Sequence, residues 1–146
     1  MDPMQQAQAT AMLLLAQHDH STQELQHKLQ QKYNLPSSDL DALLTELTSA
    51  GYLDDQSYAE CVIRSRSARG YGSTFIQHYL QQKGVASETI MQAEQELNID
   101  WLACLADLYA KKYRGRPCGT PAERQKRQRF LYSRGFSYEL IRQVLS

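Results

Sequence analysis

Three stretches of the chain place arginine and lysine side chains close together, with tyrosines interleaved among them. Clustered cations of this kind attract phosphate backbones or acidic protein surfaces. We therefore predict that these cations bind a partner, although a solvated helix face without a partner is the alternative for the first stretch. The cations are Arg64, Arg66 and Arg69 in the first stretch, Lys111, Lys112, Arg114 and Arg116 in the second, and Arg124, Lys126, Arg127, Arg129, Arg134 and Arg142 in the third.

No other residue pattern indicates a catalytic or cofactor site. The Gly-Tyr-Gly segment at 70–72 lacks the third glycine and the preceding strand that a dinucleotide site requires. His18 and His20 could approach His27 where two helices meet. Histidines at such a corner more often cap a helix than bind a metal ion. We therefore predict no catalytic residues, no cofactor and no metal site, and we expect that the protein is not an enzyme.

The formal net charge of zero conceals a strong asymmetry along the chain. Residues 1–60 hold nine acidic and two basic side chains, a net charge of −7, and residues 61–84 carry +4. Residues 85–108 carry −5, and residues 109–146 hold ten basic and two acidic side chains, a net charge of +8. Such asymmetry is informative about partners rather than about fold. Solvated faces that pair between segments are the alternative, but the C-terminal block favours a binding surface.

The elements that position these cations repeat with a period of 51 residues. Leu29, Leu80 and Leu131 occupy equivalent positions. Each copy is followed by a residue suited to the left-handed backbone conformation that ends helices. The helix-ending residues are Asn34, Gly84 and Gly135. A repeat of this length indicates three versions of one supersecondary unit.

The hydrophobic pattern has the helical period along nearly the whole chain, and strand-like alternation is absent. We predict an all-α fold of three tandem three-helix repeats, each similar to a helix-turn-helix unit, in an elongated and curved array. The predicted repeats are residues 1–53, which are acidic, residues 54–98, and residues 99–146, which are basic.

One predicted helix departs from the amphipathic pattern. Residues 122–129 contain no large apolar side chain, and only Phe130 and Leu131 anchor the helix that they begin. A helix with basic residues on all sides of its first two turns cannot pack mainly through an apolar face. We therefore predict that it is exposed, and that its cations contribute to binding and little to folding. These cations are Arg124, Lys126, Arg127 and Arg129.

The three cysteines favour a reducing compartment. They are odd in number and lack CxxC spacing, which is typical of reduced thiols in a cytosolic protein. Cys61 and Cys104 fall in apolar helical stretches and are predicted to lie in the core. No apolar run is long enough to span a bilayer. We expect a cytoplasmic monomer that does not engage a membrane.

Several short motifs occur in a fixed order along the chain. Gly-Tyr-Leu-Asp-Asp stands at 51–55, Gly-Tyr-Gly at 70–72, Lys-Gly-Val at 83–85 and Arg-Gly-Phe-Ser at 134–137. Together, and at this spacing, they resemble the RecX regulatory protein family. The similarity extends from about residue 7 to residue 145. The departures are small: Asn34 replaces a common glycine, and Tyr58 replaces a common phenylalanine.

The resemblance implies a negative regulator of the RecA recombinase. Members of the family bind RecA and the RecA–DNA filament, lie in the filament groove, and suppress ATP hydrolysis, strand exchange and coprotease activity. The role belongs to homologous recombination, DNA repair and the SOS response. The family offers no catalytic motif to transfer, so the predicted binding residues rest on the charge pattern.

A nucleic-acid-binding module that acts without RecA is the alternative. Three-helix units resemble helix-turn-helix domains, and the helix at 121–134 could lie in a major groove. The acidic first repeat argues against a tandem DNA reader, because all three units would then be expected to be basic. A protein that binds RecA could also bind DNA weakly and directly, and the sequence does not decide this.

Overall fold

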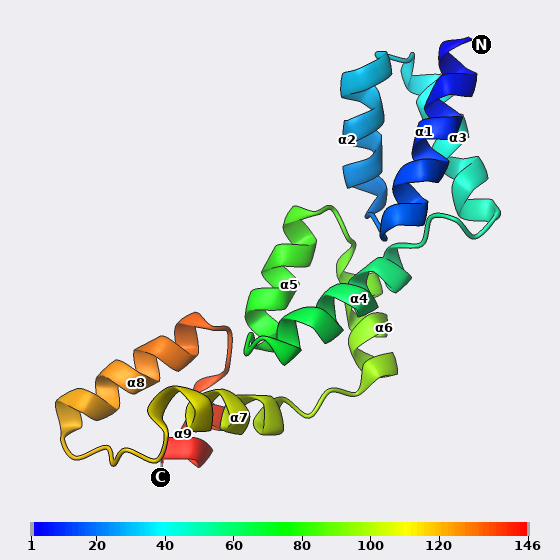
Figure 1. Cartoon of the computed structure of the whole chain (residues 1–146). Helices are drawn as coiled ribbons and strands as arrows, with labels where there is room; N and C mark the ends of the chain where they lie inside the picture. The colour runs from blue at the N-terminus through cyan, green and yellow to red at the C-terminus, as the bar shows by residue number, and fades with distance from the viewer. Residues whose placement is uncertain (1, 146) are drawn as a thin grey trace. The chain divides into compact units, whose positions relative to one another are not determined.

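The computed structural model describes residues 2–145, which form nine helices and no strand, in three groups of three (Figure 1). The predicted all-α class and three-helix repeats are confirmed. None of the helices in this described range is long and apolar enough to cross a membrane. The helices are α1 Pro3–Gln17, α2 Thr22–Tyr33, α3 Ser37–Ser49, α4 Asp55–Ala68, α5 Ser73–Gln82, α6 Ser87–Leu97, α7 Trp101–Tyr113, α8 Pro121–Ser133 and α9 Tyr138–Leu145.

The contacts among the described residues divide the chain into two compact units. The first contains the chain up to Cys61 together with Leu80–Ala93, and the second contains Val62–Tyr79 and the chain from Glu94 onward. The division falls within α4, α5 and α6, so the repeat boundaries, like the elongated array, stay predictions.

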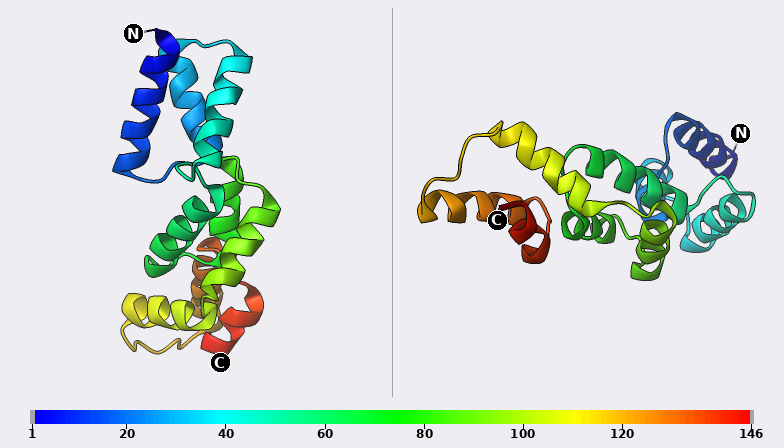
Figure 2. Two further views of the ribbon diagram at one scale, coloured as in Figure 1. Left: turned by 90° about the vertical axis from the view of Figure 1, so that its right-hand side faces the viewer. Right: turned by 90° about the horizontal axis from the view of Figure 1, so that it is seen from below.

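In the first unit, α1, α2 and α3 lie side by side (Figures 1 and 2). The predicted capping box at the start of α2 is confirmed. The Ser21 hydroxyl accepts from the Glu24 backbone N–H, and the Glu24 carboxylate accepts from the Ser21 N–H. The apolar stripes meet in one core, whose buried residues are Ala7, Ala11, Leu25, Leu29, Leu35, Leu40, Leu43, Leu44, Leu47 and Leu53.

The predicted helix ends are confirmed. Asn34, Gly84 and Gly135 have φ angles of 49°, 83° and 101°. A left-handed residue at these positions turns the chain out of the helix, so that the next apolar side chain can enter the core. The prediction for Cys61 is wrong: its side chain is exposed, whereas Cys104 is half-buried. Burial raises the pKa of the Cys104 thiol.

In the second unit, two glycine-containing loops meet backbone to backbone. The Gly72 N–H donates to the Arg134 carbonyl at 2.7 Å, and the Thr74 N–H donates to the Gly135 carbonyl at 3.2 Å. A Cβ atom on Gly72 would overlap with the Gly135 carbonyl group. Beside this contact, α7, α8 and α9 enclose a second core, whose buried residues are Leu105, Leu131, Phe136, Ile141 and Leu145.

We expect Gly72→Ala to destabilise the protein, because the added methyl group meets backbone atoms that cannot rotate away. The cost should be about 1–3 kcal/mol of unfolding free energy, as in other overpacked positions. Gly119→Ala is the matched control, since a Cβ atom there meets nothing within 4 Å, and it should stay within about 0.5 kcal/mol of wild type. Urea denaturation followed by circular dichroism gives both values. Equal midpoints for the two variants would contradict the close approach.

Candidate partner-binding surface

The charged side chains of α8 lie on different faces of the helix. Residues share a face only at spacings of three or four positions. Arg127 lies with Leu131 on the buried face, whereas Lys126 is exposed and lines a hollow together with Phe130. Arg129 lies on a third face and lines a different hollow. Neighbouring cations in the sequence therefore have different environments.

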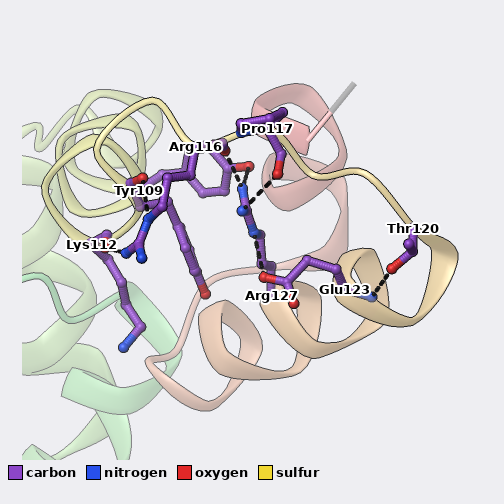
Figure 3. A network of polar contacts seen from close by, with 8 residues as sticks. Tyr109, Lys112, Arg116, Pro117, Thr120, Glu123 and Arg127 are labelled. Carbon is purple, nitrogen blue, oxygen red and sulfur yellow. Dashed lines mark hydrogen bonds and ion pairs between the residues drawn. The ribbon is translucent and has the colours of Figure 1, made fainter.

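Arg127 is the polar centre of the buried face (Figure 3). Its side chain is only 3% exposed. Nε donates to Glu123 Oε1 at 3.1 Å, and Nη1 donates to the Tyr109 hydroxyl at 2.7 Å and to the Arg116 carbonyl at 3.1 Å. Nη2 donates to the Pro117 carbonyl at 3.2 Å. The prediction that Arg127 is exposed is wrong, and its buried hydrogen bonds argue against the predicted small contribution to folding.

Arg127 can be buried because its planar guanidinium group donates to several acceptors at once. The loop at 114–119 presents carbonyl oxygens toward α8, and the centroid of the Tyr113 ring lies 4.2 Å from the guanidinium carbon of Arg127. Burial opposes the charge, but hydrogen bonds with Tyr109 and Glu123 raise the pKa of Arg127 above its ordinary value. Glu123 is itself fixed at the start of α8, where its N–H donates to the Thr120 hydroxyl. Arg127 thus fastens the loop to α7 and α8 and is not accessible to a partner.

Two further predicted cations also make internal contacts. Arg134 donates to the Gly70 carbonyl at 3.2 Å and to the Arg69 carbonyl at 2.8 Å, and its guanidinium carbon lies 4.0 Å from the Tyr71 ring centroid. Arg124 donates to the Leu145 carbonyl at 2.7 Å, near the end of α9. Arg124 therefore has a structural contact that its predicted small role in folding did not include, while partner binding by both residues stays a prediction.

Two cations of the second predicted stretch, Lys112 and Arg116, are brought together with Lys126 on one side of α8. A hollow of about 290 Å³ is lined by Lys112, Tyr113, Arg116, Glu123, Lys126 and Phe130. The Arg116 side chain turns back to donate to the Tyr113 and Lys112 carbonyls at 3.1 and 3.3 Å. The Lys112 ammonium lies 4.3 Å from the Phe130 ring centroid. Three cations thus surround a concave, partly aromatic surface.

The other predicted cations are more dispersed. Arg64, Arg69 and Arg114 are exposed, and the guanidinium carbon of Arg66 lies 4.4 Å from the centroid of the Tyr79 ring. Lys111 forms an exposed ion pair with Asp107 at 3.0 Å, which contributes little in water. The first stretch contacts the third where the Arg69 carbonyl accepts from Arg134.

A second hollow, of about 480 Å³, lies on α8 and α9 and is lined by Gln125, Gln128, Arg129, Tyr138 and Arg142. Sequence reasoning identified both arginines but missed Gln125, Gln128 and Tyr138. The signal that could have found them is the spacing of residues 125, 128 and 129, which places them on one face of a helix.

The histidine corner has no metal-site geometry. His20 is 1% exposed, and both of its ring nitrogens have partners: Nδ1 lies 3.0 Å from the His18 carbonyl, and Nε2 lies 2.8 Å from the Lys28 ammonium. Burial lowers the pKa of His20, and the Lys28 charge adds to this against the opposing hydrogen bond to His18. Within residues 2–145, no group of three or more His, Cys, Asp or Glu side chains could hold a metal ion.

The thermal stability should therefore fall as the pH is lowered from about 7 to about 5.5. The unfolded chain takes up a proton near the ordinary histidine pKa of 6.5, whereas the folded chain resists it. His20→Asn should flatten this dependence of Tm on pH, and the exposed His27→Asn control should retain it. An unchanged slope in His20→Asn would show that another group causes the effect.

Arg127→Gln should lower Tm by about 5 °C or more, because buried acceptors lose their donors. Arg127→Lys should recover little, since an ammonium group cannot present the same planar set of donors. The exposed neighbour gives the control, and Lys126→Gln should stay within about 2 °C of wild type. Thermal melts of the full chain measure all three. If Arg127→Gln and Lys126→Gln have the same Tm, the contacts of Arg127 do not stabilise the fold.

Comparison with known proteins assigns the chain to a family. Residues 54–93 match the family model of the second three-helix domain of RecX, and residues 99–145 match that of the third. The chain is 36% identical over 146 residues to the regulatory protein RecX of Pseudomonas fluorescens (strain Pf-5), covering 100% of this chain and 94% of that protein. It is 36% identical over 144 residues to the regulatory protein RecX of Escherichia coli O9:H4 (strain HS), covering 92% and 86%.

The crystal structure of RecX from Lactobacillus salivarius has the same fold, with a TM-score of 0.80 at 20% identity, covering 99% of this chain and 95% of that one. A second solved structure, of a regulatory protein RecX, also gives a TM-score of 0.80, at 22% identity, and covers 98% and 71%. The sequence matches over the full length and the shared fold agree, and the chain belongs to the RecX family of regulatory proteins.

Proposed function

We propose that this protein binds the RecA recombinase and its filament on DNA, and that binding suppresses ATP hydrolysis, strand exchange and coprotease activity. The observation that carries the proposal is the match to proteins named regulatory protein RecX over the whole chain. The activity would belong to homologous recombination, DNA repair and the SOS response in the bacterial cytoplasm, with the protein acting as a monomer.

The surface chemistry supports binding to a large anionic assembly. Lys112, Arg116 and Lys126 surround the hollow beside α8, and residues 109–146 carry a net charge of +8. A filament of protein on DNA presents phosphate groups and acidic side chains along its length. Exposed cations steer association with such a surface and lose effect as salt is added. Inhibition of this kind requires binding rather than catalysis.

The alternative is a helix-turn-helix reader of duplex DNA that acts without RecA. In such a reader, several side chains of one helix would reach base edges in the major groove. In α8, Arg127 is buried, and Arg124 donates to the Leu145 carbonyl. The acidic residues 1–60, with a net charge of −7, would also be repelled by duplex phosphates. These features weigh against a duplex reader.

The direct test measures ATP hydrolysis by cognate RecA on single-stranded DNA, with this protein added below one molecule per RecA subunit. We expect inhibition at substoichiometric amounts and a loss of inhibition as salt is raised. Strand exchange by preformed filaments should fall in parallel. Full RecA activity at equimolar protein in low salt would refute the proposal.

Neutralising the cations of the α8 hollow should weaken this inhibition. The double variant Lys112→Gln/Lys126→Gln should raise the concentration for half-inhibition roughly 2- to 30-fold, since each exposed charge contact contributes a fraction of a kcal/mol to about 1 kcal/mol. Lys32→Glu on the exposed surface of α2 changes the net charge by the same amount and should inhibit like wild type. If both variants lose inhibition equally, overall charge rather than this hollow controls binding.

A further inference from the structure

The hollow on α8 and α9 is formed by two stripes of side chains that meet within the second unit. Residues 125, 128, 129 and 132 share one face of α8, because they are separated by three or four positions. Tyr138 and Arg142 are four positions apart on α9. The α8 and α9 helices are in direct contact, and residues 125, 128 and 129 of the first stripe and both residues of the second line an open hollow of about 480 Å³.

Two tyrosines form an exposed aromatic surface at this place. The rings of Tyr132 and Tyr138 stack with centroids 4.4 Å apart and planes 8° apart. Their side chains are 52% and 46% exposed, so the pair is not part of the core. Two rigid rings held in parallel, in contact with water, form a platform on which a further planar group can stack.

The polar side chains that line the hollow beside Tyr138 are two arginines and two glutamines, and no carboxylate is among the lining side chains within residues 2–145. Arg142 Nε donates to the Tyr138 carbonyl at 3.3 Å, which holds the arginine beside the ring. The Arg129 side chain is exposed and lines the hollow. Gln125 and Gln128 each add an amide that can donate and accept. The hollow thus offers cations for phosphates, amides for base edges and rings for base faces.

We infer that this hollow binds single-stranded nucleic acid directly, without RecA. Bases stack on the tyrosine pair, and Arg129 and Arg142 contact the backbone phosphates. A duplex is a poor ligand because its base faces are already stacked and cannot reach the rings. An acidic protein segment would use the two arginines but would leave the stacked rings without a function. This inference goes beyond the proposed regulation of RecA and is independent of it.

The test is fluorescence anisotropy of a labelled oligothymidine of about 20 nucleotides with the full chain, at about 50 mM salt and without RecA. Tyr132→Leu/Tyr138→Leu should raise Kd about fivefold or more, because stacking on both rings is lost. Tyr132→Phe/Tyr138→Phe keeps the rings and should bind like wild type. Tyr52→Leu removes a tyrosine that is 54% exposed in the first unit and should also bind like wild type.

The arginines have a separate readout. Arg129→Gln/Arg142→Gln should reduce the slope of log K against log salt by about 1.4, which corresponds to two phosphate contacts on a single strand. Circular dichroism melts verify that each variant is folded.

The inference is overturned if wild type does not bind the oligonucleotide, or if a folded leucine variant binds it like wild type. It is equally overturned if a duplex of the same length competes as well as the single strand. If the leucine variant binds the oligonucleotide normally but no longer inhibits RecA, the hollow is a protein contact instead. Because the assay contains no RecA, its outcome is independent of the proposed inhibition.

Discussion

The arrangement of the C-terminal helices depends on the buried charge of Arg127. A buried guanidinium group is tolerated only where acceptors surround it, and here they come from the Glu123 carboxylate, the Tyr109 hydroxyl and two carbonyls of the loop at 114–119. These partners belong to α7, the following loop and α8. One side chain therefore fixes the rotation of α8 about its axis and the path of the loop. The faces that α8 presents to solvent follow from that rotation.

A close contact between two backbone segments explains the positions of two of the motifs that the chain shares with the RecX family. The Gly-Tyr-Gly segment at 70–72 and the Arg-Gly-Phe segment at 134–136 are far apart in sequence but meet in the second unit. Gly72 donates to the Arg134 carbonyl, and the Arg134 guanidinium lies on the Tyr71 ring. The glycines are required because backbones approach too closely for a Cβ atom. These two motifs are therefore explained by packing, whatever Arg134 contributes to partner binding.

The exposed faces of α8 are suited to different partners. The face of α8 that carries Lys126 borders a partly aromatic hollow with three cations, and this hollow suits an acidic or phosphate-rich surface of any kind. The face of α8 that carries Arg129 borders the hollow on α8 and α9. That hollow has amide side chains and lies beside the stacked tyrosine pair, and these groups suit the edges and faces of unpaired bases. A regulator of a protein–DNA filament gains from both, because two weak contacts on one rigid helix strengthen each other through effective concentration.

The sequence by itself determined the helical class, the repeat and the helix ends, because these depend on neighbours within a few residues. Asn34, Gly84 and Gly135 follow the repeated leucines by four or five positions, and all three have the left-handed backbone. The sequence also located the basic C-terminal region. Only the tertiary structure decided that Arg127 is buried while Lys126 is exposed. One position along a helix turns a side chain by about 100°. The loop packed beside the helix decides whether a side chain in that direction meets water or buried carbonyls. The residues around Arg127 in the sequence do not predict where that loop packs.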